Sequence, residues 1–272
     1  MTSIATNRAA IRVQYHGINN VKHENQAYTR LSSGLRITSA SDDAAGLFIA
    51  GRMKAQITGI ERAIKNTHDG ISLVNTAEAN LNEIRSMVLR MRELAVQMAN
   101  GVYLDSPDRG LAQLEVDQLL QQVDMIATNA NFNDVQLLDG TMQNIGIQTG
   151  PSANERPSIF FRDSTSAGLG IEDVDITTQN NAKSAMVTLN TALTTISDEI
   201  SRAGAYDNRF NHTIAVSEMT SKATKISRGR IVDADVAKES TNLSKAQVLS
   251  KANTAMLAQA NNALSTVLTL FN

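Results

Sequence analysis

The sequence AQVLSKANTAMLAQANNALSTVLTL, residues 246–270, decides the fold class of this 272-residue chain. One row of mostly apolar residues returns along it in alternating steps of three and four. Its members are Ala246, Leu249, Asn253, Met256, Ala260, Ala263, Val267 and Leu270. Seven-residue repeats of this kind are typical of coiled-coil helices. A second row, Leu257, Leu264 and Phe271, also repeats every seven residues. The helix predicted over about 233–271 therefore has more than one apolar face.

The other end of the chain supplies a helix that can pair with it. Ile4, Ile11 and Ile18 recur every seven residues in a predicted helix over about 3–33. The C-terminal helix has few charges, so it is not expected to stand alone in water. We predict a mainly α fold, a long antiparallel helical hairpin or coiled-coil rod with a small β-hairpin region in the middle of the chain. The apolar faces left over would need other copies or other proteins.

A second long helix is predicted over about 43–100, because one face of its later part is apolar at helical spacing. That buried stripe is Val74, Ala77, Leu81, Ile84, Val88, Met91, Ala95 and Met98. A polar stripe follows the same steps about 100° around the helix: Glu83, Ser86, Arg90, Glu93 and Gln97. Leu89, Leu94 and Val96 lie off both stripes, which indicates that the helix meets more than one neighbour.

The sequence pattern changes in the middle of the chain. Ser106 and Pro107 predict the N-cap and first residue of a helix over about 107–130. Between about 132 and 180, glycine and proline separate short apolar pieces such as SIFFRD and LGIEDVDI. These predict short strands and turns, with a hairpin around GPSANERP. A further helix is predicted over about 180–228, with a break or a continuation at Gly229.

The stretch SSGLRITSASDD, residues 32–43, predicts a joint between two helices. Gly34 stands where a helix C-cap glycine is expected. Ser41, Asp42 and Asp43 are candidates for capping the next helix, whose N-terminus favours acidic side chains. Capping is favoured over a metal site at the paired carboxylates.

Several classes of function lack support in the sequence. There is no cysteine, which excludes disulfides and thiolate zinc sites. The four histidines have no metal-binding spacing, so we predict no metal. The chain has no P-loop motif and no GxSxG motif, so we predict no cofactor and no enzyme. A net charge of −2 gives no reason to expect nucleic acid. No apolar run is long enough for a transmembrane helix or shaped like a secretory signal, so membrane insertion and a cleaved signal are not expected.

Both ends of the chain carry long, ordered motifs. The N-terminal ones run from LSSGLRITSASDDAAGLFIAGRMKAQ through LRMRELAVQMANG to FNDVQLLDG. The C-terminal ones are AGAYDNRFNHTI, RIVDADVAKE and AMLAQANNALSTVLTLFN. Together these motifs resemble those of bacterial flagellins. The resemblance covers roughly 1–140 and 180–272, and only about 40 residues separate its halves. The large variable outer domains of longer flagellins are therefore absent.

The resemblance implies two layers in a filament. Residues 1–43 and 236–272 would form an inner-core coiled coil that is disordered in the free monomer. Residues 44–235 would form a surrounding helical rod with a small β region at about 140–178. Export through the flagellar type III channel, without a cleaved signal, would place the protein outside the cell in the filament. A hook–filament junction adaptor has the same architecture and is the alternative.

The resemblance also assigns residues and partners. The inner-core assembly residues would be Ile4, Ile11, Ile18, Leu249, Met256, Leu257, Ala260, Leu264, Val267, Leu270 and Phe271. Protofilament contacts, and recognition by a host Toll-like receptor, would use Arg90, Glu93, Leu94, Gln97 and Glu115. The main partner is the chain itself as a helical homopolymer. An export chaperone, the filament cap and hook-associated proteins are expected as further partners.

Overall fold

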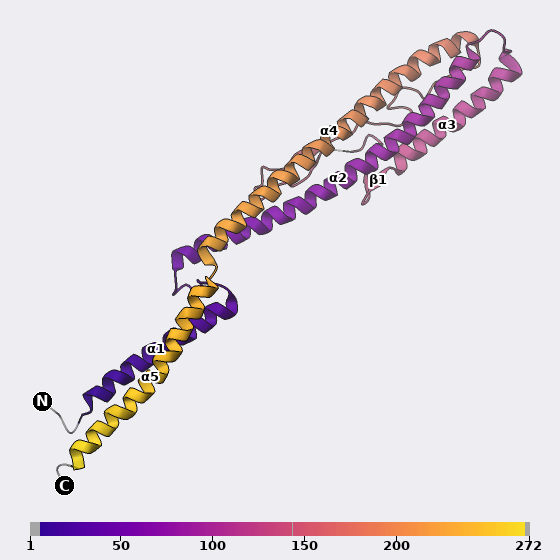
Figure 1. Ribbon diagram of the computed structural model, residues 1–272. Helices are drawn as coiled ribbons and strands as arrows, with labels where there is room; N and C mark the ends of the chain where they lie inside the picture. The colour runs from indigo at the N-terminus through magenta and orange to yellow at the C-terminus, as the bar shows by residue number, and fades with distance from the viewer. Residues whose placement is uncertain (1–5, 143, 270–272) are drawn as a thin grey trace. The chain divides into compact units, whose positions relative to one another are not determined.

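The structure, a computed structural model, describes residues 6–142 and 144–269. Over these residues the chain is mainly helical, as predicted (Figure 1). The long helices are α1 (Arg8–Ser33), α2 (Ala44–Met98), α3 (Gly110–Asn129), α4 (Gln179–Val232) and α5 (Val236–Thr269). The short strands are β1 (Asn131–Phe132), β2 (Val135–Gln136), β3 (Ile145–Gly146) and β4 (Ser158–Ile159). Helix α4 continues through Gly229 without a break.

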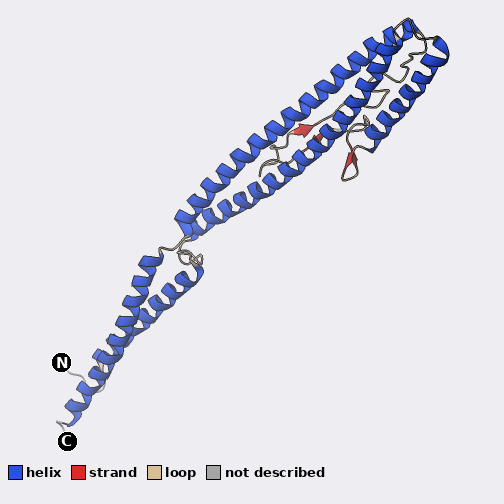
Figure 2. Ribbon diagram, turned by 45° about the vertical axis from the view of Figure 1, so that its right-hand side comes forward, coloured by secondary structure: helices blue, strands red, loops and turns tan. Residues whose placement is uncertain are grey.

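The chain divides into two compact units. Unit 1 consists of Met1–Ile57 and Lys222–Asn272, and unit 2 consists of Thr58–Ser221. Unit 1 therefore holds α1, α5, the first turns of α2 and the last turns of α4. Unit 2 holds the rest of α2 and α4 together with α3 and the strands (Figure 2).

The core of unit 2 confirms the apolar stripe predicted for α2. All eight of its members are buried, seven of them with no exposed surface: Val74, Ala77, Leu81, Ile84, Val88, Met91, Ala95 and Met98. Helices α3 and α4 contribute the facing side chains, such as Val116, Val123, Leu189 and Ile196. Alternating steps of three and four keep one side of a helix aligned, and here that side is packed along its whole length.

The segment between α3 and α4 holds two small antiparallel hairpins. Strands β1 and β2 pair around Asn133 and Asp134, which both have positive φ. Strands β3 and β4 pair Ile145 with Ile159 and Gly146 with Ser158, so they enclose GPSANERP as predicted. The prediction of a strand in LGIEDVDI was wrong. There the α3 side chain of Gln113 donates to the Val174 carbonyl and accepts from the Ile176 amide, which replaces a strand partner.

The predicted start of α3 was also wrong. A five-residue π-helical turn, Asp105–Arg109, precedes the helix. The N-cap of this turn is Leu104, and Ser106 lies inside the turn. The Asp108 carboxylate accepts from the Leu104 amide at 3.1 Å. The Arg109 side chain is buried and donates to the carbonyls of Met98 and Asn100 at 2.8 and 2.9 Å. These bonds fix the turn in a way that a Ser-Pro pattern alone does not predict.

Candidate assembly surfaces

Helices α1 and α5 of unit 1 lie side by side and run antiparallel (Figure 1). Asn7, just before α1, donates to the Ala260 carbonyl near the far end of α5. Toward the other end, Gln247 donates to the Tyr28 hydroxyl and Arg30 donates to Glu239. These contacts fix one register for the pair.

The seam between the two helices consists mainly of small and polar residues. Its members on α1 are at least partly buried and follow steps of three and four: Ala10, Val13, Gly17, Asn20, Glu24, Ala27 and Leu31. The facing members on α5 are Leu243, Ala246, Ser250, Asn253, Leu257 and Ala260. Small side chains allow the two helices to approach closely, and Leu31, Leu243 and Leu257 are the largest apolar residues between them.

Other large apolar residues of the pair point outward. Ile11 is 48% exposed, Ile18 66%, Leu249 40% and Met256 57%. Of the row predicted on α5, Ala246, Asn253 and Ala260 lie in the seam, whereas Leu249 and Met256 turn away from α1, in line with the expectation of more than one apolar face. Every side of this helix carries apolar or small residues, so the period alone did not select the paired side.

The remaining predicted assembly residues divide into two groups. Leu257 and Ala260 lie in the seam. Ile4, Leu270 and Phe271 lie outside the described residues, and Leu264 and Val267 lie in the part of α5 whose side chains are not described.

A groove of about 370 Å³ opens along one side of the pair, lined by Val13, Gly17 and Ile18 on α1 and by Asn253, Thr254 and Leu257 on α5, among others. The Nδ2 atom of Asn253 is buried and has no hydrogen-bond partner among the described residues. A buried amide left unpaired costs about 1–3 kcal/mol. The groove thus combines exposed apolar surface with one donor that still lacks an acceptor.

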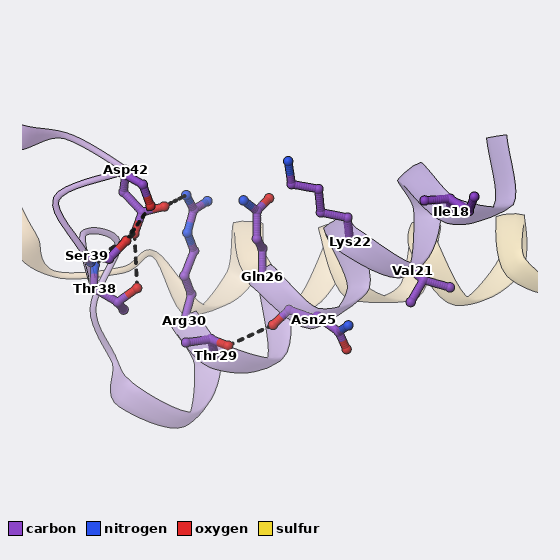
Figure 3. A pocket seen from close by; sticks show the side chains of 11 residues that line it. Ile18, Val21, Lys22, Asn25, Gln26, Thr29, Arg30, Thr38, Ser39 and Asp42 are labelled. Atoms are coloured by element: carbon purple, nitrogen blue, oxygen red, sulfur yellow. Dashed lines mark hydrogen bonds and ion pairs between the residues drawn. The ribbon is translucent and has the colours of Figure 1, made fainter. Parts of the chain in front are cut away.

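The joint between α1 and α2 is built by backbone geometry and two carboxylates. Gly34 ends α1 with φ of 69°, the left-handed conformation of a glycine C-cap. Asp43 accepts from the Gly46 amide at 2.9 Å and so caps α2. Asp42, predicted as a second cap, has a different role. Its Oδ2 accepts from the amides of Thr38 and Ser39 at 3.1 and 3.2 Å, and so organises the loop (Figure 3).

Arg30 connects this loop to both terminal helices. Its guanidinium lies 3.7 Å from Asp42 and 3.3 Å from Glu239 at the start of α5. Hydrogen bonds from the Thr38 amide and hydroxyl, together with those from Ser39, hold the pKa of Asp42 below its usual range. Ser41 bonds the Ser39 hydroxyl at 2.7 Å and does not cap α2. The sequence pattern missed Arg30 and Glu239, since their meeting depends on the register of α1 against α5.

In unit 2, Arg90 joins residues of two helices at the surface. It donates to Glu115 on α3 at 2.8 Å and to Glu93 at 3.4 Å. Gln97, on the same side of α2, donates to the Tyr103 hydroxyl. Leu94 is only 4% exposed and belongs to the core, so its expected place on a contact surface was wrong. The surface that remains is polar and formed by Arg90, Glu93, Gln97 and Glu115.

Within 6–142 and 144–269, no three His, Asp or Glu side chains are placed to hold a metal ion together. No described helix is long and apolar enough to cross a membrane.

Comparison with known proteins gives matches along most of the chain. The family model for the bacterial flagellin N-terminal helical region matches residues 4–143, and that for the C-terminal helical region matches 186–271. A flagellin of Halalkalibacterium halodurans is 38% identical over 253 residues, which cover 92% of this chain and 93% of that protein. Flagellin FlaB2 of Treponema pallidum is 37% identical over 257 residues, or 89% of this chain and 90% of that one.

A solved structure agrees with these matches. The crystal structure of Bacillus cereus flagellin is 30% identical, with a TM-score of 0.50 over 56% of this chain and 88% of that chain. Only residues 144–185 lie between the two matched regions, so no large extra domain separates the halves. The chain belongs to the bacterial flagellin family, in its short form.

Proposed function

We propose that this flagellin polymerises by burying the outward apolar residues of α1 and α5 between copies. As a flagellin, the chain is a structural subunit of the flagellar filament. The observation that carries the proposed surface is the exposure of Ile11, Ile18, Leu249 and Met256, while small residues occupy the seam within the chain. Fully burying one such side chain stabilises by about 1.5–3 kcal/mol, so a repeated contact using all four is a strong driving force.

The same arrangement supports the layered model expected from the resemblance. In that model 1–43 and 236–272 form the inner core of the filament, and 44–235 form the rod around it. A seam of small and polar residues buries little apolar surface, so α1 and α5 gain much of their order from neighbouring copies. A weakly ordered monomer also suits export through a narrow channel to the outside of the cell. A chaperone would be its partner before export, and the filament cap would be its partner after export.

The polar surface around Arg90 is proposed as a second contact between copies along a protofilament. Its support is the exposure of the ion pairs, with Arg90 51%, Glu93 69% and Glu115 45% exposed at the side chain. Exposed pairs are worth about 0–1 kcal/mol each, so this surface would specify register more than affinity. Recognition of the same surface by a Toll-like receptor rests on the resemblance of the matched residues.

Truncation tests the role of α5. Removing 253–272 deletes Met256 and the seam residues Leu257 and Ala260, and leaves unit 2 intact. We expect a folded, monomeric protein that forms no filaments under conditions where the full chain does, by electron microscopy and sedimentation. Filaments from the truncated chain would contradict the proposed mechanism.

Seeded growth tests filament extension itself. Purified full-length chain is added to sheared filament fragments, and filament length is measured over time. We expect continuous elongation, since a subunit offers its assembly surface again after each addition. Binding that stops after one layer would instead indicate a junction adaptor.

A further inference from the structure

Helix α2 carries two apolar residues at the surface of unit 2, beside its buried stripe. Leu89 is 43% exposed and Val96 is 46% exposed. They are seven residues apart, so at about 100° per residue they share one side of the helix. Their positions off both stripes predicted a further neighbour for α2, yet the described part of the chain leaves both side chains in contact with solvent.

Helix α4 extends the same surface. Arg92 donates to the Asn190 side chain at 2.6 Å, where α2 and α4 run antiparallel beside each other in unit 2 (Figure 1). Val96 lies one turn beyond Arg92, and Val187 lies about one turn before Asn190, so both valines lie on the same side of this bond. Val187 is 67% exposed. We define the Leu89 face as Arg85, Leu89, Arg92, Val96, Lys183 and Val187.

The charges around the Leu89 face are mostly positive. On α2 from 85 to 96 and on α4 from 179 to 197, the charged residues are Arg85, Arg90, Arg92, Glu93 and Lys183. The one acid among them, Glu93, is paired with Arg90 at 3.4 Å. Arg92 donates to a neutral side chain, so that bond does not balance its charge. A partner for this face should therefore be apolar with acidic residues beside it.

Helix α3 carries a surface of that character. Its buried side is Val116, Val123 and Ala127. Its opposite side exposes Leu111 at 65%, Leu114 at 61% and Met125 at 54%. We call these three exposed residues the α3 ridge.

The charged residues of α3 are all acidic: Glu115, Asp117 and Asp124. Asp117 accepts from the Gln113 amide group at 2.8 Å, and Asp124 accepts from the Ser166 hydroxyl at 2.8 Å. These donors are neutral, so the two bonds leave the negative charges unbalanced. The α3 ridge is thus apolar in acidic surroundings, which complements the Leu89 face.

The ridge that meets the Leu89 face cannot belong to the same chain. The chain's own α3 contacts the other flank of α2, where Glu115 accepts from Arg90 at 2.8 Å. Arg90 lies about 100° around α2 from Leu89. The ridge lies opposite the buried side of α3, so it faces away from α2. A second copy is therefore needed to bring the two surfaces together.

We propose that the α3 ridge of one copy docks on the Leu89 face of the next copy in the filament. The inference rests on the proposed polymerisation and adds to it a named contact between the unit 2 regions of two copies. Two different faces meet in this contact, so each bound copy still presents one free face. Such heterologous contacts generate rings or open helical polymers rather than isologous dimers.

Cysteine cross-linking tests the pairing, because the chain has no cysteine of its own. Filaments are grown from equal amounts of unchanged, Val187→Cys and Leu114→Cys chains, treated with a short bis-maleimide and run on a denaturing gel. Both positions are more than 60% exposed, so neither change disturbs the core. Leu111→Cys and Met125→Cys replace Leu114→Cys in parallel mixtures, so that the whole ridge is sampled. We expect a dimer band from at least one mixture and none from any variant alone.

The matched control is Val216→Cys, which is 58% exposed on the same side of α4, about 44 Å further along the helix. Mixed with the ridge variants, it should give no dimer. Filaments that contain the cysteine chains but give no mixed dimer would overturn the docking, as would dimers from Val187→Cys alone or equal cross-linking of Val216→Cys. Exclusion of Val187→Cys from filaments that admit Val216→Cys would support a contact at this face. Failure of the unchanged chain to form filaments would instead contradict the proposed function.

Discussion

Replacing Ile18 by alanine gives the most direct quantitative test of the proposed assembly surface. The side chain loses three carbon atoms, each worth roughly 0.8 kcal/mol when buried. Ile18 is 66% exposed in the free chain, so about two-thirds of that loss, or about 1.6 kcal/mol, belongs to assembly rather than to folding. Since about 1.4 kcal/mol corresponds to a tenfold change, we expect the critical concentration for polymerisation to rise roughly 15-fold.

The assay measures soluble protein left after polymerisation at several total concentrations. Val216→Ala is the matched control, because Val216 is 58% exposed on α4 of unit 2 and lies outside both proposed interfaces. We expect its critical concentration to stay near that of the unchanged chain. Circular dichroism of both monomers checks that helix content is unaltered. An Ile18→Ala shift no larger than that of Val216→Ala would refute the assignment of this face to the assembly.

Four other predictions concern folding and the joint. Because the pKa of Asp42 is lowered in the folded chain, the stability that its carboxylate contributes is present above the unfolded pKa of about 3.9 and is lost as pH falls through the lower folded pKa. Asp42→Asn should therefore remove this loss at acid pH, measured as amide-exchange protection of the loop. An unchanged pH profile would contradict this prediction. Arg109→Met leaves the Met98 and Asn100 carbonyls without their donor and should cost about 1–3 kcal/mol for each carbonyl in urea unfolding. A total loss below about 1 kcal/mol would show the cap to be dispensable. Asp134→Gly should stabilise by roughly 0.5–1 kcal/mol, because Asp134 has φ of 64° in a two-residue hairpin turn that favours Asn-Gly; destabilisation in the same urea assay would count against the strain argument. Gly34→Val places a β-branched residue at φ of 69° and should destabilise the joint by at least about 1–2 kcal/mol. Electron microscopy should then show altered filament curvature or failed assembly. Unchanged filaments would show that the joint is passive.

The long stripe on α2 was predictable because a single physical condition governs it. The eight residues from Val74 to Met98 recur at helical spacing on one side, so one orientation of the helix buries all of them. Leu94 lies off that stripe and is also buried, as expected for a helix that meets more than one neighbour. A helix in contact with more than one neighbour buries a wider arc than one row of residues describes.

The seam of α1 with α5 shows where periodicity stops being informative. Rows through Met256 and through Leu257 both repeat every seven residues, yet only Leu257 faces α1 within the chain. The choice of the paired side depends on how closely the backbones approach, which is set by small residues such as Gly17 and Ala27.

Prediction from sequence was limited in the same way at the joint between α1 and α2. Asp43 caps α2 by a local bond that sequence can predict, whereas Arg30 reaches Glu239 only because α5 returns alongside α1.

Under the proposed mechanism, this division of residues would explain how one chain stays single before assembly and still polymerises. If the large residues Ile18 and Met256 were in the seam, the pair would be stable alone and its outer surface would be inert. In the proposed assembly, a seam mainly of small and polar residues would make the free pair weak, and each added copy would supply the burial that the chain lacks. Ordering of α1 and α5 would then be coupled to binding, and mass action would make it depend on subunit concentration. Proteolysis tests this coupling: cleavage in α1 and α5 of the monomer should be much faster than in unit 2, and it should slow sharply once filaments form. Equal protection of both units in the monomer would mean that the pair is stable without neighbours.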